Sequence, residues 1–217
     1  MKRKLTLRYL IFLFGIFLMG LGISLTAKIN LGTTPISSVP LLLSEIFPPI
    51  TFGTMAFLLG LLFIVIEFFI LRKNFTLIHL SQIIVIPFFG YFIDLGMLIF
   101  KNLKPETYLE NIIILTIACL IIAFGISLQV IARVLINSAE GLVAVIAEKT
   151  HCKFGNIKIL FDVSLIIIAI IISLTAFGEI RYIREGTFIV AIALGSLSKV
   201  YLRFFEWIGI DWLYTKS

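Results

Sequence analysis

Charged residues are scarce in this chain, and their scarcity is the first clue to its class. Only 14% of the 217 residues are Asp, Glu, Lys or Arg, whereas 60% are hydrophobic and 21 are Phe. A soluble domain of this length has too little interior for so much apolar surface, whereas a lipid-embedded domain need not bury it. The net charge of +6 is not gathered into a basic stripe on a polar domain. We therefore expect membrane lipids as partners and no nucleic acid.

Cysteine and the usual catalytic motifs are also in short supply. Cys119 lies within an apolar run and Cys152 in a connection, so we expect no structural disulfide and no metal-ligand spacing. His79 and His151 each lack a second His or Cys at metal-binding distance in the sequence. A nucleophile elbow, a phosphate-binding loop and a catalytic acid pair are missing as well. The sequence therefore predicts no catalytic residue, no metal and no cofactor, and a protein that is not an enzyme.

Long apolar runs supply what the charged residues do not. A helix needs about 20 apolar residues to cross a bilayer. Six stretches meet this requirement, and they predict an all-α, polytopic fold: Tyr9–Lys28, Thr51–Leu71, Thr76–Phe100, Asn111–Ala132, Ile157–Phe177 and Gly186–Trp207. The basic start of the chain is like a signal peptide, but the first run is long enough to span and no small-residue cleavage site follows it.

The chain also repeats itself. Gly22–Leu25 recurs 103 positions later as Gly125–Leu128, and Gly53 and Gly90 recur as Gly155 and Gly195 with similar offsets. This predicts two halves of one membrane domain, residues 1–105 and 106–217, with three spans each. Because three is odd, the second half enters the membrane from the opposite side, and the two repeats are inverted.

Basic residues predict the orientation of the spans, because they concentrate on the cytoplasmic side. With a cytoplasmic N-terminus, ten of them face inward and five face outward. The inward group is Lys2, Arg3, Lys4, Arg8, Arg72, Lys73, Lys149, Lys153, Arg203 and Lys216, and the outward group is Lys28, Lys101, Lys104, Arg181 and Arg184. We therefore expect a multi-pass protein of the bacterial cytoplasmic (inner) membrane with both termini cytoplasmic.

Two connections, Ile29–Ile50 and Arg133–Asn156, occupy matching places after the first and fourth spans and are too apolar for ordinary loops. Each predicts a short helix, Pro35–Phe47 or Ser138–Lys149, of about 18–20 Å, roughly half a bilayer. In one interpretation these are broken or re-entrant half-helices that meet near the midplane. In the other they lie flat at the interface as connectors, and the polar stripe on the first favours this.

The starts of these short helices are the best candidate site. Pro35 suits a first helical turn, and Asn137 with Glu140 three residues later reads as an N-cap and a capping-box acid. Free N–H groups at a helix N-terminus suit an anionic or acceptor-rich ligand. The candidate substrate-binding residues are Ser24, Asn30, Thr33, Thr34, Ser37, Asp94, Ser127, Arg133, Asn137, Ser138, Glu140 and Lys199.

Some of these charges have alternative interpretations. Arg133 either pairs with Glu140 in the interior or extends to the lipid headgroups. Asp94 and Lys199 occupy matching positions, but inversion places them about 12 Å apart along the membrane normal, so they bracket a cavity or reach separate interfaces. Glu67 and Asp162 read as interface charges near the ends of their spans.

Three segments resemble the YczE/YyaS/YitT group of bacterial polytopic membrane proteins. They are Gly20–Leu25 running into Gly32–Pro35, the Pro87–Asp94 segment, and Gly186-Thr187 leading through Ala191–Gly195. The resemblance implies six spans and a cytoplasmic-membrane location, and it implies no established substrate. Lys199 stands where an acid like Asp94 is expected, which argues against a two-acid mechanism.

The leading hypothesis is a small transporter or flippase that moves an unidentified small molecule or lipid by alternating access of its two repeats. One alternative is a substrate-binding membrane subunit that needs an energising partner. Another is a non-transporting membrane scaffold or regulator. The expected partners are therefore membrane lipids, the unidentified ligand, and either a second copy of the chain in a homodimer or an energising subunit.

Overall fold

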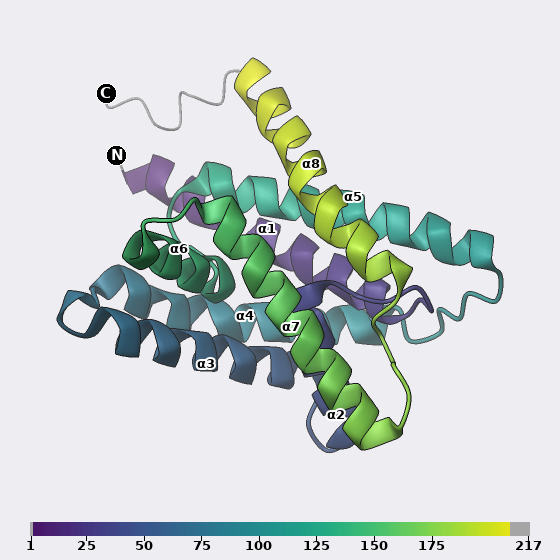
Figure 1. Cartoon of the computed structure of the whole chain (residues 1–217). Coiled ribbons are helices and arrows are strands. Elements are labelled where there is room, and N and C mark those ends of the chain that lie inside the picture. Colours follow the sequence, from purple (N-terminus) through teal and green to yellow (C-terminus); the bar gives the residue numbers. More distant parts are fainter. Residues whose placement is uncertain (1, 209–217) are drawn as a thin grey trace.

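The computed structural model describes residues 2–208, and the fold over this range is entirely helical (Figure 1). The long helices are α1 (Lys2–Ala27), α3 (Phe52–Leu71), α4 (Leu77–Ile99), α5 (Tyr108–Ala132), α7 (Phe154–Phe177) and α8 (Glu185–Trp207). The short ones are α2 (Pro35–Ile46), α6 (Ser138–Thr150) and the 3-10 turn η1 (Arg72–Asn74). Lys216, one of the basic residues used to predict orientation, lies outside the described residues.

The six long helices are long and apolar enough to cross a membrane, so the chain is a polytopic membrane protein. Their positions confirm the six predicted spans, although α1 begins at Lys2 rather than at Tyr9. Large apolar side chains on the outer helices are exposed, among them Ile171 on α7 and Ile192 on α8. Such exposure suits contact with lipid and would be costly in water.

Local sequence signals set the ends of several helices. The hydroxyl of Thr51 accepts from the amide of Thr54 and starts α3, and Thr107 and Glu110 form a reciprocal capping box at the start of α5. Each such cap stabilises a helix by about 1 kcal/mol. Gly178, with φ of 73°, ends α7 in the left-handed conformation that glycine adopts without strain.

Helices α1 and α5 pack side by side along most of their length and run antiparallel. Arg8 contacts the carbonyl oxygen of Ala132 at one end of the pair, and the amide of Asn30 contacts the side chain of Asn111 just beyond the other. Between these ends, the helices are so close that a Cβ on Gly15 would lie 2.7 Å from the carbonyl oxygen of Gly125. The helices that carry the repeated Gly-Ile-Ser-Leu sequence therefore point in opposite directions, as expected for inverted repeats.

The packing partners of the two halves also correspond. Helix α1 packs on α4 as α5 packs on α8, and α2 packs on α7 as α6 packs on α3. Within each half, α2 packs on α3 and α6 packs on α7. This supports the predicted division at residue 105, which remains a prediction because packing alone does not fix a repeat boundary.

The packing of α3 on α4 has no equivalent in the described part of the second half. Helices α3 and α4 pack closely, and a Cβ on Gly53 would lie only 2.0 Å from the carbonyl oxygen of Gly90. Their counterparts α7 and α8 do not pack closely over the described residues. Gly155 and Gly195, which match Gly53 and Gly90 in the repeat, have open space where a Cβ would be. The second half is therefore looser than the first.

Candidate functional site

The site begins with a chain of hydroxyl groups where α1 ends and α2 starts. The hydroxyl oxygens of Thr26 and Thr33 lie 2.7 Å apart, and those of Thr33 and Ser37 lie 2.8 Å apart. Thr34 contacts the hydroxyl of Ser37 and also accepts from the amide of Ser37 at 3.3 Å, which caps α2. All four side chains are buried. A buried polar network that satisfies its own hydrogen bonds fixes the position of the helix start.

The loop between α7 and α8 supports the start of α2. The amide of Thr33 donates to the carbonyl oxygen of Tyr182 at 3.0 Å. The amide of Gly186 donates to the carbonyl oxygen of Leu31 at 2.8 Å. The connection between α1 and α2 is thus bonded to the connection between α7 and α8. Asn30, a predicted site residue, lines a cavity of about 320 Å³ here, beside Arg181 and Arg184.

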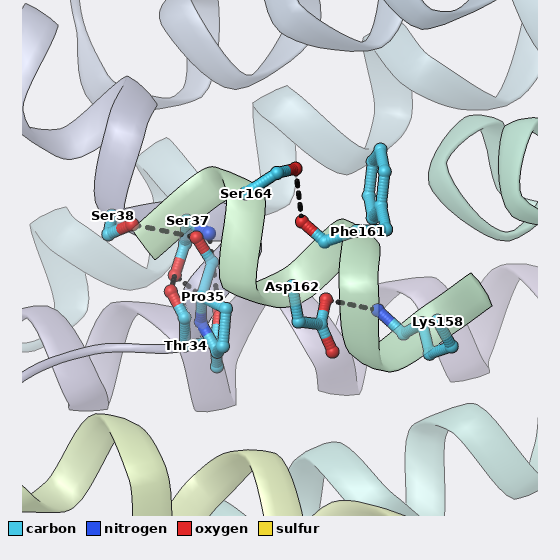
Figure 2. Close-up of polar contacts among 8 residues, drawn as sticks. All are labelled: Thr34, Pro35, Ser37, Ser38, Lys158, Phe161, Asp162 and Ser164. Carbon is cyan, nitrogen blue, oxygen red and sulfur yellow. Dashed lines mark hydrogen bonds and ion pairs between the residues drawn. The ribbon is translucent and has the colours of Figure 1, made fainter. Parts of the chain in front are cut away.

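Helix α2 also packs against α7. Figure 2 shows Thr34, Ser37 and Ser38 around this turn, beside the α7 segment that carries Lys158 and Asp162. These two residues form an ion pair with a Nζ–Oδ1 distance of 2.7 Å. The charge on Asp162 is thus balanced within α7.

The predicted meeting of the two half-helix starts is present in the structure. Ser37 from α2 and Asn137 and Ser138 from α6 line one cavity, closed on its other sides by apolar residues of α3 and α4 such as Gly60 and Ile86. Its volume of about 20 Å³ holds roughly one water molecule. Both short helices bury most of their residues against α3 and α7, so they are built into the bundle rather than laid on its surface.

A larger cavity adjoins the start of α6. Its volume is about 450 Å³, within the usual range of about 300–1,000 Å³ for ligand pockets. Three of the predicted residues, Arg133, Asn137 and Glu140, line it together with Gln129, and the remaining walls are apolar. Asn137 lines both this cavity and the small one, so it stands at the junction between them.

The turn that ends α5 forms part of the wall of this cavity. Arg133 adopts the left-handed conformation with φ of 47°, and this ends α5. The guanidinium group of Arg8 donates to the carbonyl oxygens of Ala132 and Arg133, each at 2.7 Å. These carbonyls have no partner inside the helix, so Arg8 satisfies the C-terminal groups of α5 from the other half of the chain.

The start of α6 differs from the sequence prediction. Asn137 occupies the N-cap position, but its side chain makes no capping hydrogen bond, so the capping box with Glu140 is wrong. The buried Oε2 atom of Glu140 has no hydrogen-bond partner within the described part of the chain. Lys158 and Asp162 are close enough to act on it electrostatically. The Oδ1 atom of Asn137 accepts from the hydroxyl of Ser138 at 3.5 Å.

Four further predicted residues belong neither to the hydroxyl network at the start of α2 nor to the lining of any of these cavities. The hydroxyls of Ser24 and Ser127 donate to backbone carbonyl oxygens of neighbouring helices, at Ile93 and Ser198 respectively. Asp94 accepts from the hydroxyl of Thr51 at 2.6 Å and from the amide of Gly53 at 2.7 Å, so it holds the first turn of α3. Lys199 is exposed on α8. The structure does not bring Asp94 and Lys199 together at either cavity.

One important residue was misjudged. Glu67 was expected at an interface because Arg72 and Lys73 follow it, but its side chain is completely buried between α3, α4 and α6. No local signal reveals this, because α6 lies about 70 positions further along the chain. Among the described residues, no group of three His, Cys, Asp or Glu side chains could hold a metal ion.

Comparisons with known proteins place the chain in a family without assigning a substrate. No curated protein and no solved structure matches it. A family model matches residues 6–203, which include every residue that lines the two α6 cavities. The chain therefore belongs to this family, a family of unknown function, DUF6198.

Proposed function

We propose that this protein is a small membrane transporter or flippase, and not an enzyme, that moves a small molecule or lipid by alternating access of its two halves. The observation that carries the proposal is the convergence of the two half-helix starts, since Ser37 from one half and Asn137 and Ser138 from the other share a cavity. In transporters built from inverted repeats, broken helices meet in this way around the substrate.

The larger cavity suggests the chemistry of the ligand. Its walls are mostly apolar, and Arg133, Gln129, Asn137 and Glu140 supply polar groups at one end. An amphipathic molecule with a charged or zwitterionic head fits this combination, because its tail contacts apolar wall while its head meets both charges. The uncapped start of α6 adds free N–H groups suited to an acceptor-rich head.

The proposal includes an orientation. The two termini face the cytoplasm in a bacterial inner membrane, because the basic residues favour that side by ten to five. The resemblance to the YczE/YyaS/YitT group supports the same location. The small cavity, with room for roughly one water, then represents an occluded state in which neither half gives solvent full access.

The test starts from the purified protein. Mass spectrometry of lipids and metabolites that stay bound supplies the ligand candidates. Proteoliposomes then measure transfer of tail-labelled fluorescent phospholipids between leaflets, by quenching with an impermeant reductant, and uptake of any metabolite found. We expect transfer or uptake well above that of protein-free vesicles.

A matched pair of variants ties activity to the site. Asn137→Leu removes the amide shared by both cavities and should slow transfer roughly tenfold or more, since a lost hydrogen bond to a polar ligand costs about 1–3 kcal/mol. Asn156→Leu changes an exposed amide in the first turn of α7 and should have little effect. If transfer requires a co-purifying ATPase, the protein is a subunit of a larger uptake system. If no bound molecule is transferred, the protein is a non-transporting scaffold. Either result overturns the proposal.

A further inference from the structure

A fully buried carboxyl group lies one helical turn away from the small cavity. Glu67 on α3 has no exposed surface, although it sits within one of the six apolar helices. Its Oε2 atom contacts Nδ1 of His79 and Nε2 of Gln82, both on α4 and each at 3.0 Å. Ionisable groups inside membrane helices are costly, and they mark ion or proton pathways far more often than soluble surface charges do.

The cluster of Glu67, His79 and Gln82 has too few hydrogen-bond donors for its buried acceptors. Oε1 of Glu67 and Oε1 of Gln82 are both buried, and neither has a hydrogen-bond partner among the described residues. An unpaired buried acceptor costs about 1–3 kcal/mol. A proton on the carboxyl group would supply a donor in place of one of these acceptors. The arrangement is therefore suited to taking up a proton.

His79 connects this carboxyl group to the surface. The imidazole side chain is 23% exposed, whereas that of Glu67 is 0% exposed. The ring lies next to η1, where it stacks on Phe75 with ring centroids 5.4 Å apart. A histidine that is partly exposed on one side and contacts a buried acid on the other can relay protons.

The same three helices lead from the cluster to the small cavity. Phe63, Ile86 and Ser138 line that cavity. About one helical turn away from them lie Glu67 on α3, Gln82 on α4 and Gly141 on α6. A Cβ on Gly141 would lie 2.7 Å from Oε1 of Glu67 and 2.6 Å from Nε2 of Gln82. The missing side chain at Gly141 thus makes room for the acid at the contact between α3 and α6, one from each half.

The surrounding charges favour a proton over a metal cation. The carboxyl group of Glu67 contacts His79 and Gln82 of α4 and lies beside Gly141 of α6. Arg72 and Lys73 of η1 are exposed. The neighbouring acid on α6, Glu140, has its electrostatic partners on α7. Hard cations need about six oxygen ligands, and this cluster offers one carboxylate and one amide oxygen.

We propose that Glu67 is a proton-binding site that couples proton movement to the conformation of the two halves, with His79 as its relay to solvent. A hydronium ion in the solvent gives its proton to Nε2 of His79 and becomes water, and the Nδ1 proton passes to Oε2 of the Glu67 carboxylate. This leaves a neutral imidazole and a neutral carboxylic acid. The coupling role rests on the transporter function proposed above, whereas proton binding by Glu67 does not.

Infrared difference spectroscopy of the whole protein in lipid nanodiscs tests proton binding without any substrate. We expect the carbonyl stretch of a protonated carboxylic acid to appear as the pH is lowered, to shift in deuterated water, and to disappear in Glu67→Gln. The matched control Glu148→Gln removes an exposed acid on α6 and should keep the band. In His79→Gln the band should remain, but its deuterium exchange should slow roughly tenfold or more because the relay is gone.

The outcomes separate the two proposals. A band that survives in Glu67→Gln, or that is missing from the wild type across the titration, overturns the proton site even if transport is observed. A band that vanishes only in Glu67→Gln supports the site even if proteoliposomes show no transport, and in that case the transporter function fails. If Glu67→Gln does not fold, unchanged exchange in His79→Gln still contradicts the relay.

Discussion

Ser24 and Ser127, 103 positions apart, make the same two contacts in the two halves of the chain. The hydroxyl of Ser24 lies 2.8 Å from the carbonyl oxygens of Gly20 and Ile93. That of Ser127 lies 2.7 Å from the carbonyl oxygen of Ala123 and 3.3 Å from that of Ser198. Each serine thus joins the first long helix of its half to the last one. The repeated Gly-Ile-Ser-Leu sequence therefore has a structural explanation that does not require a ligand.

Replacing Ser24 by Ala should destabilise the protein by about 0.5–1.5 kcal/mol, because a buried interhelical hydrogen bond is lost. The matched control is Ser164→Ala, which removes an exposed hydroxyl that bonds only to its own helix at Phe161 (Figure 2). Unfolding in a denaturing detergent titration measures both variants. Equal stability of the two variants would show that the contact between Ser24 and Ile93 is not maintained.

Gly53 and Gly155 provide a test of the asymmetry between the halves. Gly53→Ala places a Cβ 2.0 Å from the carbonyl oxygen of Gly90 and should destabilise the protein by about 1–3 kcal/mol. Gly155→Ala meets open space and should be neutral, or stabilising by up to about 1 kcal/mol through helix propensity. If Gly155→Ala is as harmful as Gly53→Ala, α7 and α8 pack as closely as α3 and α4 do.

Asp94→Asn should lower stability by about 0.5–2 kcal/mol, because the amide is a weaker acceptor than the carboxylate for the first turn of α3. Lys199→Ala, at the matching position of the second half, should be nearly neutral since the side chain is exposed. Thermal denaturation in detergent compares the two. Unchanged stability in Asp94→Asn would remove the capping role and leave ligand binding as the reason for this acid.

The orientation is tested by cysteine labelling in whole cells. Asn102→Cys lies between α4 and α5 and should react with an impermeant maleimide from outside, whereas Lys73→Cys in η1 should react only after permeabilisation. The native Cys119 and Cys152 are first replaced to remove background labelling. The opposite pattern would mean that both termini are external.

Much of the architecture could be predicted from sequence because its signals are local. Hydrophobic length located the six spans, and Pro35 marked the start of α2. The direction of the two halves followed from an odd number of spans per repeat, and the antiparallel packing of α1 and α5 agrees with it.

The rest depended on contacts between distant segments. Asn137 has the right residue type for an N-cap, but its side chain makes no capping hydrogen bond and the residue lines two cavities. Asp94 was read as a membrane acid in need of a partner, and its partners proved to be a hydroxyl and an amide at the start of α3. Glu67 was assigned to an interface because of its cationic neighbours, yet α6 covers it from the other half. Packing across the repeats is not encoded in any short pattern.

The most direct test of the central claim is whether Asn137 can be reached from both sides of the membrane. In the cysteine-free background, Asn137→Cys is exposed to an impermeant maleimide from the outside in cells and from the cytoplasmic side in inverted vesicles. Alternating access predicts labelling from both sides, at rates that change in opposite directions when a bound ligand is added. Labelling from one side alone, or from neither, would contradict a site that opens to each side in turn.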